Sequence, residues 1–250
     1  MNHTVAIVPA RLASTRLPGK ALLEIAGKPM VCWVAERALA ARNVDRVIVA
    51  TDSHEIINAV RSSGVEGVLT DPNHTSGTDR VAEVAAKIPH AAIIVNVQGD
   101  EPMISPETIE RAVDVMALEI SKTNGAGIVT TWEPIDSLDD LQNPDLVKVV
   151  LDENENAIYF SRSPIPYPRD AAKRHDLKLF RKHTGLYVYR RDVLLEFTKW
   201  PQSRLEKIEA LEQLRALERG VKIKVVKACT ASTGVDTVED LERVRTLIEA

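Results

Sequence analysis

The chain has 250 residues, of which 44% are hydrophobic and 27% are charged, a composition typical of a globular protein with a substantial core. Its formal net charge is −4, so the overall basic excess that favours nucleic-acid binding is absent, although a local cationic pocket could still hold a nucleotide. The 2 cysteines, Cys32 and Cys229, form no Cys-x-x-Cys or Cys/His cluster, which argues against a disulfide framework or a structural zinc site.

No stretch approaches the roughly 18 consecutive apolar residues of a membrane-spanning helix, and the first residues do not follow the pattern of a signal peptide. We therefore expect a cytoplasmic protein that uses neither a membrane nor nucleic acid as a partner.

The first half alternates short apolar runs with amphipathic segments. Continuous runs such as Ala92–Val95 are typical of strands buried on both faces, as in a parallel sheet, and this βαβα order predicts a doubly wound α/β domain. Asp52, with Glu55 three residues later, is expected to cap the second helix, and Gly64 to close it. The expected strands are Val5–Val8, Arg46–Thr51, Gly67–Leu69, Ala92–Val97 and Gly127–Thr131, and the expected helices are Met30–Ala41, His54–Ser62, Asp79–Lys87 and Pro106–Ile120.

The first expected strand runs into a short loop that carries Arg11, Arg16 and Lys20 with small residues between them. Ligands of open α/β sheets bind at the carboxyl ends of the strands. Three fixed cations there, together with backbone N–H groups, suit a triphosphate. The alternative is a solvated basic loop without a ligand.

A second motif is Asn96–Pro102, where an apolar strand ends, Gly99 permits a tight turn and Asp100 follows. Its carboxylate is well placed to hold Mg²⁺ against a phosphate, although a turn or helix-capping role is the alternative. Asp236 also lies between a strand region and a helix, where capping is the simpler role. Together with Asp100 it would supply a second oxygen ligand for the metal.

A third motif, His74–Arg80, runs small polar residues into the start of a helix and places a cation one turn in. Ser76 or Thr78 is expected to cap that helix. The functional interpretation is a contact with a base or a ribose through hydroxyls, backbone groups and Arg80.

The middle of the chain, approximately residues 146–200, is expected to form an inserted subdomain on the edge of the sheet. Val147–Leu151 and Ala157–Phe160 predict a hairpin around a polar turn, and Leu186–Tyr189 predicts another strand. The three prolines of Ser163–Arg169 exclude regular helix, and the basic Lys173–Lys182 is expected to be an exposed loop. Arg162 and His183 could recognise an anionic substrate, but from the residues alone a surface arginine and a structural histidine are favoured.

One long helix is expected between Ser203 and Gly220, because Ser203 and Glu206 form a capping box and Gly220 can close the helix. A strand at Lys222–Lys227 and a last helix at Val238–Ile248, capped by Thr237, follow. The apolar stripe expected on the long helix is Leu205, Ile208, Leu211, Leu214 and Leu217.

The sequence lacks three common motifs of α/β enzymes. It contains no Gly-x-Gly-x-x-Gly, no Gly-x-x-x-x-Gly-Lys-Ser/Thr and no Gly-x-Ser-x-Gly. These absences disfavour a dinucleotide-dependent oxidoreductase, a P-loop kinase and an α/β-hydrolase.

With these motifs in order along nearly the whole chain, the sequence resembles the family of 3-deoxy-manno-octulosonate (Kdo) cytidylyltransferases. The resemblance implies a Rossmann-like nucleotide-diphospho-sugar transferase fold, with a mixed, mostly parallel sheet flanked by helices. It also implies a homodimer, assembled through the inserted subdomain, that converts CTP and Kdo into CMP-Kdo and pyrophosphate with Mg²⁺ for lipopolysaccharide synthesis. The matching stretches are Pro9–Lys20, Val49–Asp52, His74–Arg80, Val95–Pro102, Val147–Leu151, Phe160–Arg162, Leu205–Arg215 and Thr233–Val244.

The resemblance also implies roles for individual residues. Those implied to bind the nucleotide are Pro9, Ala10, Arg11, Ser14, Arg16, Lys20, His74, Ser76, Gly77, Arg80 and Gln98. Those implied to shape the Kdo site are Gln98, Arg162, His183, Tyr187, Glu212 and Gln213. The implied metal ligands are Asp100 and Asp236, which together with Arg11 and Lys20 form the implied catalytic set.

The expected reaction is attack of the anomeric hydroxyl of the sugar acid on the α-phosphorus of CTP, with pyrophosphate as the leaving group. Two other hypotheses about the function stay open from the sequence. One is a cytidylyltransferase for another sugar acid, either an amino-substituted Kdo or a sialic acid. The other is a catalytically silent regulator that binds the nucleotide without releasing pyrophosphate.

Overall fold

Strand β1 (His3–Ala10) lies inside the main sheet of the computed structural model, which describes residues 3–13 and 17–249. Val5 and Ile7 on one face of the strand and Ala6 and Val8 on the other are all fully buried. The strand is therefore covered on both sides, as its continuous apolar sequence predicts.

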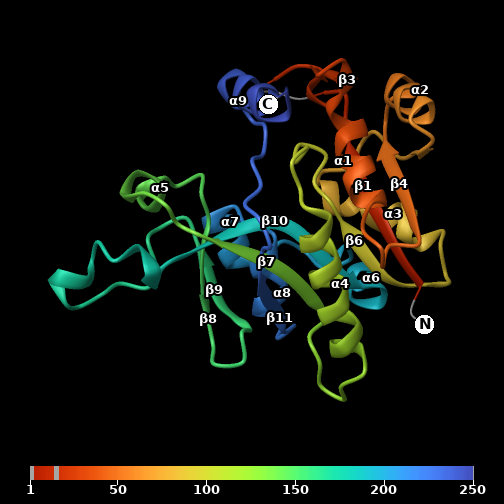
Figure 1. Ribbon diagram of the computed structural model, residues 1–250. Helices are drawn as coiled ribbons and strands as arrows, with labels where there is room; N and C mark the ends of the chain where they lie inside the picture. Colours follow the sequence, from red (N-terminus) through yellow and green to blue (C-terminus); the bar gives the residue numbers. More distant parts are fainter. Residues whose placement is uncertain (1–2, 14–16, 250) are drawn as a thin grey trace.

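Within the described residues the main sheet has nine strands, seven of them in the order β11-β7-β10-β6-β1-β4-β5 (Figure 1). A small two-stranded sheet follows the first loop. The remaining strands are β2 (Glu24–Ile25), β3 (Lys28–Pro29), β4 (Arg46–Thr51), β5 (Glu66–Leu69), β6 (Ala91–Asn96), β7 (Ile128–Pro134), β8 (Lys148–Leu151), β9 (Ala157–Ser161), β10 (Arg181–Arg190) and β11 (Ile223–Lys227).

The four helices expected in the first half of the chain are present, and each observed end lies within two residues of the expected one. The helices are α1 (Met30–Leu39), α2 (His54–Ser62), α3 (Gly77–Ala86), α4 (Pro106–Ile120), α5 (Leu138–Gln142), α6 (Arg191–Phe197), α7 (Arg204–Glu209), α8 (Gln213–Glu218) and α9 (Val238–Glu249), and the 3₁₀ turns are η1 (Lys20–Leu22), η2 (Ala171–Lys173) and η3 (Leu177–Leu179).

The sheet is mixed and mostly parallel, as expected. Strand β1 pairs in parallel with β4 and with β6. The pairs β4–β5 and β7–β11 are also parallel. Strand β10 is antiparallel to both β6 and β7. Helices α1, α2 and α4 pack on one face, and helices α3, α6 and α8 pack on the other. The carboxyl ends of β1, β4 and β6 therefore meet at one edge, where a ligand site is expected.

The cap of α2 differs from the expectation that Asp52 fills this position. Ser53 is the N-cap, and its hydroxyl accepts from the amides of Glu55 and Ile56. The carboxylate of Asp52 instead accepts from the guanidinium of Arg80. A cap one residue later in the chain releases Asp52 for this long-range ion pair.

The single long helix expected between Ser203 and Gly220 is also wrong, because the chain forms α7 and α8 with a break at Ala210, whose φ is +52°. The capping box of Ser203 and Glu206 is present. At the break, the carbonyls of Glu209 and Ala210 accept from the side chain of Arg162 rather than from the next helical turn. Ile208, expected on the buried stripe, is 67% exposed.

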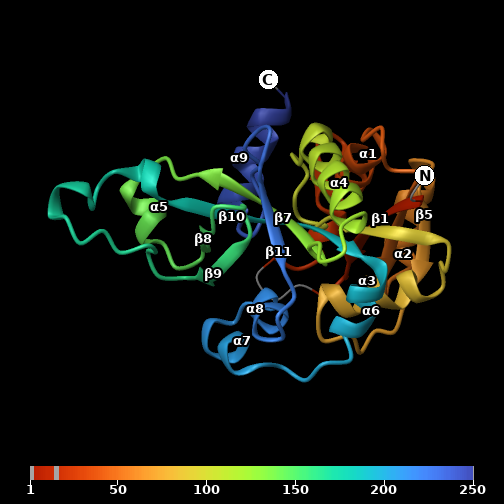
Figure 2. The ribbon, with the colours of Figure 1, turned by 90° about the horizontal axis from the view of Figure 1, so that it is seen from below.

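The middle of the chain contains the expected hairpin, formed by β8 and β9. Together with α5 and the chain between β9 and β10, it lies to one side of the sheet, away from β1 and α1 (Figures 1 and 2). Strand β10 leaves this region and enters the main sheet between β6 and β7. It begins at Arg181, so the expected exposed loop ends earlier than Lys182, which is ion-paired with Glu133 at 2.7 Å.

The last helix, α9, returns to the first loop. Val235, Leu241 and Val244 form a small apolar cluster with Leu17 and Ile25. This packing brings the segment before α9 to the edge of the sheet where β1 and β6 end. Among the described residues, no helix has the length and apolar character needed to cross a membrane.

Candidate active site

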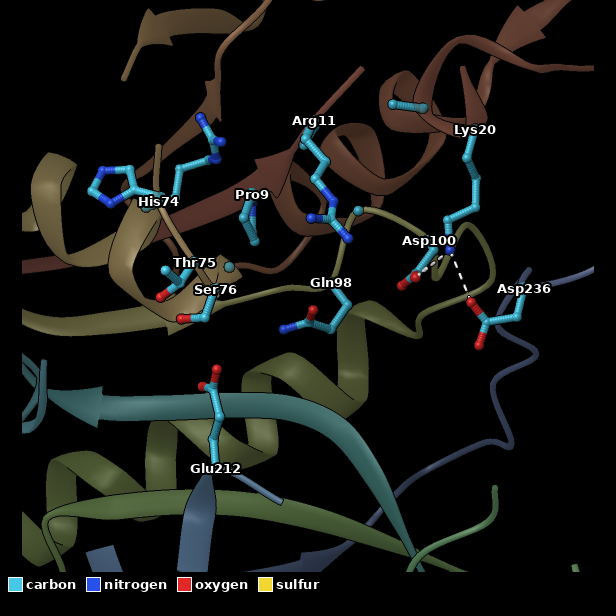
Figure 3. Close-up of a pocket in the computed structure, with 15 residues that line it drawn as sticks. Pro9, Arg11, Lys20, His74, Thr75, Ser76, Gln98, Asp100, Glu212 and Asp236 are labelled. Atoms are coloured by element: carbon cyan, nitrogen blue, oxygen red, sulfur yellow. Dashed lines mark hydrogen bonds and ion pairs between the residues drawn. The ribbon is translucent and has the colours of Figure 1, made fainter. Parts of the chain in front are cut away.

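A cavity of about 360 Å³ opens where β1 and β6 end (Figure 3). Every described residue that was predicted to bind the nucleotide lines it, and so do both predicted metal ligands. Ser14 and Arg16 lie outside the described residues. The lining residues are Pro9, Ala10, Arg11, Lys20, Ala21, His74, Thr75, Ser76, Gly77, Arg80, Gln98, Gly99, Asp100, Glu212 and Asp236.

Lys20 and the two predicted metal ligands meet at one end of this cavity. The Nζ of Lys20 lies 2.6 Å from Oδ2 of Asp100, 3.0 Å from Oδ1 of Asp236 and 2.9 Å from the carbonyl oxygen of Val235 (Figure 3). Lys20 follows Gly19, whose φ of +65° turns the chain into η1. The packing of α9 on the first loop supplies Asp236, so three distant segments build this cluster.

The residues around Lys20 fit a magnesium ion. Two carboxylate oxygens and a carbonyl oxygen already surround one cationic centre, and Mg²⁺ prefers oxygen ligands. Mg²⁺ commonly takes one or two carboxylates and completes its coordination with water and substrate phosphates. Asp100 and Asp236 supply the carboxylates that such a site needs.

Arg11 extends into the same cavity between Lys20 and the base of the first loop (Figure 3). Its side chain is exposed and makes no hydrogen bond or ion pair with the described part of the chain. A guanidinium binds phosphate oxygens bidentately, so Arg11 is available for an anionic ligand.

The opposite end of the cavity is formed by the start of α3. Ser76 caps this helix by accepting from the amide of Asp79 at 3.1 Å. A Cβ on Gly77 would touch the ring of Pro9 at 3.4 Å, so the helix start and the end of β1 are in close contact. Pro9 and Gly77 therefore form one partly apolar wall at this end of the cavity, against which a planar ring could stack.

Arg80 is the buried cation of this end, and only 3% of its surface is exposed. Its Nη1 donates to Oγ1 of Thr70 at 2.5 Å, and its Nη2 donates to Oδ2 of Asp52 at 3.0 Å. Burial of a guanidinium requires such partners, because an unpaired charge loses its hydration without compensation.

Gln98 and Glu212 face each other across the middle of the cavity (Figure 3). Gln98 donates from Nε2 to Oδ1 of Asn96 at 3.1 Å. Glu212 stands at the N-cap of α8 and accepts from the hydroxyl of Thr78 at 2.7 Å. The break between α7 and α8 thus directs one of the predicted sugar-site residues into the cavity.

The other residues predicted for the sugar site lie outside this cavity lining. Arg162 donates to the carbonyls of Glu209, Pro144 and Ala210, with the shortest distance 2.7 Å. Gln213 is buried on α8. Of these predicted residues, Glu212 therefore lines the cavity, whereas Arg162 and Gln213 do not.

His183 and Tyr187, also predicted for the sugar site, lie on β10 with their rings 5.4 Å apart. Nε2 of His183 is 2.9 Å from the hydroxyl of Thr130. Desolvation lowers the pKa of His183 to about 3, so its ring is neutral at neutral pH. This histidine can donate or accept a hydrogen bond but carries no charge toward an anion.

Gly99 lines the cavity and Glu101 lies two residues further along the chain, although neither was among the predicted site residues. Burial, with a smaller contribution from Asp100, raises the pKa of Glu101 to about 7, and its Oε2 has no hydrogen-bond partner among the described residues. A Cβ on Gly99 would lie 2.7 Å from the carbonyl oxygen of Pro9. The tight turn expected at Gly99 was the signal for this close approach, whereas Glu101 left no signal in the sequence.

Comparisons with known proteins agree with the geometry of the cavity. Residues 5–223 match the family model described as cytidylyltransferase. A 3-deoxy-manno-octulosonate cytidylyltransferase of Geobacter sulfurreducens is 52% identical and covers 98% of both chains, and one of Pseudomonas fluorescens is 49% identical over 98% of this chain and 97% of its own.

Solved structures show the same relationship. A CMP:2-keto-3-deoxy-manno-octonic acid synthetase complexed with CTP superposes with a TM-score of 0.91, at 43% identity over 99% of both chains. A 4-diphosphocytidyl-2C-methyl-D-erythritol synthase from Anaerococcus prevotii superposes with a TM-score of 0.65 at 12% identity, over 100% of this chain and 99% of its own. The second likeness concerns the fold alone.

Proposed function

The chain belongs to the family of 3-deoxy-manno-octulosonate cytidylyltransferases, and from this premise we propose that it transfers CMP from CTP to Kdo and releases pyrophosphate. The observation that carries the proposal is that Arg11, Lys20, the buried Arg80 and the two carboxylates converge on one cavity. Such a cavity matches a nucleoside triphosphate in shape and charge, with a ring at one end and phosphates at the other.

In this proposal the cytosine packs against the wall that Pro9 and the start of α3 form together, near Ser76 and Arg80. The ribose lies beside Gln98, and the triphosphate runs toward Arg11 and Lys20. The partly apolar wall that Gly77 and Pro9 form supports the position of the base, and Arg11, which has no ion-pair partner among the described residues, supports that of the phosphates. Ser14 and Arg16 of the same loop are proposed to assist.

Asp100 and Asp236 are proposed to hold Mg²⁺, with the carbonyl of Val235 nearby as a further oxygen ligand. When bound, the ion would supply positive charge for the phosphates of CTP. Arg11 and Lys20 would stabilise the negative charge that develops on the α-phosphate and on the leaving pyrophosphate.

Kdo is proposed to enter beside Glu212, on the side of the cavity that faces β10. Its anomeric hydroxyl attacks the α-phosphorus, the bond between the α- and β-phosphates breaks, and the hydroxyl proton passes to solvent. Both reactants are anionic, so fixed cations that hold them together offset the mutual repulsion. The further residues proposed for the sugar are Arg162, His183, Tyr187 and Gln213, which would have to approach the cavity in the complex.

We also propose a cytoplasmic homodimer in which the subdomain around residues 146–200 forms the contacts between protomers. Ile158 and Tyr167 in this region are 59% and 73% exposed, so they offer apolar surface to a partner. The product would serve lipopolysaccharide synthesis.

Pyrophosphate release from CTP and Mg²⁺, measured with Kdo and separately with N-acetylneuraminate, tests the proposed reaction. Release with Kdo alone supports it. Release with N-acetylneuraminate instead would assign a sialic-acid activator. Silence with both sugars, from protein that binds CTP in calorimetry, would exclude the proposed reaction.

A further inference from the structure

Asp52 connects three parts of the cavity that come from distant points of the sequence. It stands at the end of β4, next to Thr51, and 16% of its side chain is exposed. One carboxylate oxygen, Oδ2, accepts from Nη2 of Arg80 on α3 at 3.0 Å. The other oxygen, Oδ1, accepts from the backbone amide of Leu12 in the first loop at 3.3 Å.

The second partner of Arg80 is Thr70, which directly follows β5 and is hydrogen-bonded to the end of β4. The hydroxyl of Thr70 accepts a hydrogen bond from Nη1 of Arg80 and donates one to the carbonyl of Thr51 at 3.0 Å. Both anchors of the guanidinium therefore come from the ends of β4 and β5. Of the five N–H donors of Arg80, two are used in this way within the described chain, which leaves the others for a ligand in the cavity.

We propose that Asp52 is a positioning residue for nucleotide binding, which fixes Arg80 at the base end of the cavity and links it to the backbone of the first loop. This inference rests on the proposed function, because it requires a nucleotide in this cavity. Asp52 does not line the cavity and acts through its two partners. It sets the distance between the arginine that faces the base and the loop that carries Arg11 toward the phosphates.

The chemistry of Asp52 explains why an ionised carboxylate is needed here. Both of its oxygens face N–H donors, one from a cation and one from the backbone. An asparagine would present an NH₂ group to one of these donors and would leave the charge of Arg80 without its counter-ion. A buried guanidinium without its counter-ion shifts toward water or toward other acceptors, which misplaces it for the ligand.

The chain offers a matched control at the other end of the same pair of strands. Oδ2 of Asp45, just before β4, accepts from the backbone amide of Thr4 at 2.8 Å. Asp45 and Asp52 thus make the same kind of bond between the β4 region and the β1 region, but only Asp52 also bonds to a residue that lines the cavity, Arg80. Because Oδ2 of Asp45 also lies 3.5 Å from Nδ1 of His3, Asp45→Ala gives an upper limit for what the loss of such a bond costs the fold.

The experiment measures CTP affinity by calorimetry and steady-state kinetics for the wild type, Asp52→Asn, Asp52→Ala and Asp45→Ala. We expect Asp52→Asn and Asp52→Ala to weaken CTP binding by at least about tenfold and to raise the KM for CTP accordingly. The KM for Kdo and kcat should change by less than about threefold, and Asp45→Ala should bind CTP like the wild type. A purely structural role would instead lower the thermal midpoint in both Asp45 and Asp52 variants without this selective change in KM.

A double variant tests whether Asp52 acts through Arg80. In the background of Arg80→Met, the further change Asp52→Ala should weaken CTP binding by less than about threefold, because the partner it positions is already gone. Fully additive losses, or folded Asp52 variants that bind CTP within twofold of the wild type, would overturn the proposal. Wild-type protein that binds no CTP would refute the proposed function itself, so the two failures are distinguishable.

Discussion

The ammonium of Lys20 lies 2.6 Å from Asp100, at the position where the two predicted metal ligands converge. The same side chain was predicted to hold the triphosphate, so one member of the implied catalytic set contacts both implied metal ligands. This positive charge offsets the repulsion between the carboxylates of Asp100 and Asp236. On the proposed function, a divalent cation held by these two carboxylates would take the place of the ammonium, and Lys20 would then be available for a phosphate.

Replacement of Lys20 by methionine should therefore tighten the binding of a divalent cation to the nucleotide-free protein. We expect an increase in Mn²⁺ affinity of about tenfold or more, measured by electron paramagnetic resonance with Mn²⁺ as a probe for Mg²⁺. The same variant should bind CTP more weakly, because it has lost a cation that faces the phosphates. Lys28→Met is the control, since Lys28 pairs with Glu36 at 2.6 Å outside the cavity. Equal or weaker Mn²⁺ binding in Lys20→Met would contradict this competition.

Asp100→Ala should abolish most turnover while the protein stays folded. The change removes one of two carboxylates that are proposed to hold the metal, and the remaining Asp236 cannot replace it. The measurement is pyrophosphate release at saturating Mg²⁺, CTP and Kdo, with the thermal midpoint as a check on folding. Turnover near the wild-type level under these conditions would refute the role of Asp100 as a metal ligand.

Arg11→Ala should weaken CTP binding by at least about tenfold, because a charge-assisted bond to phosphate contributes about 1.5–3 kcal/mol. The fold should be unaffected, since Arg11 is exposed and has no partner within the described chain. Calorimetry of CTP binding gives the affinity, and cytidine serves as the comparison ligand. A nucleoside without phosphates should bind Arg11→Ala and the wild type equally, and an unchanged affinity for CTP would argue against the phosphate contact.

Local patterns in the sequence predicted the parts of the structure that depend on local interactions. Helix α2 begins and ends where expected, because its apolar period and Gly64 mark its bounds, although Ser53 and not Asp52 caps it. The cavity was also predictable, because the ends of parallel strands gather the loops that follow them. The positions of Arg11, Lys20 and Asp100 at this cavity could be predicted from their own loops, because each of these loops follows a strand of the sheet.

The predictions that failed concern residues with distant partners. Asp52 fits a local capping pattern, but its partner Arg80 lies 28 residues further along the chain. The long helix fits a local apolar period, but Arg162 takes the carbonyls at the break from 47 and 48 residues away. Because a side chain from another element decides each of these cases, the pattern within one segment could not reveal it.

The half-buried, desolvated ring of His183 should make the stability of the protein depend on pH. Its pKa of about 3 in the folded chain lies well below the value near 6.5 of an unfolded chain. Between these values only the unfolded chain binds the proton, so stability is lost as the pH falls from about 6.5 toward 3. Between pH 7.5 and pH 5, we expect the wild type to lose about 1–2 kcal/mol more free energy of unfolding than His183→Gln. Parallel losses in the two proteins, measured by urea denaturation, would show that His183 titrates normally.

The ion pair of Arg215 and Glu206 should stabilise the α7–α8 connection that carries Glu212. Nε and Nη2 of Arg215 donate to the two oxygens of Glu206 at 2.8 and 2.5 Å, and both residues are buried. Arg215→Met leaves the carboxylate of Glu206 buried without its counter-ion, which should lower the free energy of unfolding by about 3 kcal/mol.

Urea denaturation measures this loss, and Arg219→Met provides the control. Arg219 is exposed at the end of α8 and packs its guanidinium over the ring of Trp200 at 5.0 Å, so its replacement should cost less than about 1 kcal/mol. If the unpaired carboxylate causes the loss, the double variant Glu206→Gln/Arg215→Met should recover at least half of it, because glutamine keeps the capping box but carries no charge. A double variant as unstable as Arg215→Met would instead assign the loss to the packing of the arginine on Phe197, since the centre of that ring lies 4.6 Å from the guanidinium carbon of Arg215.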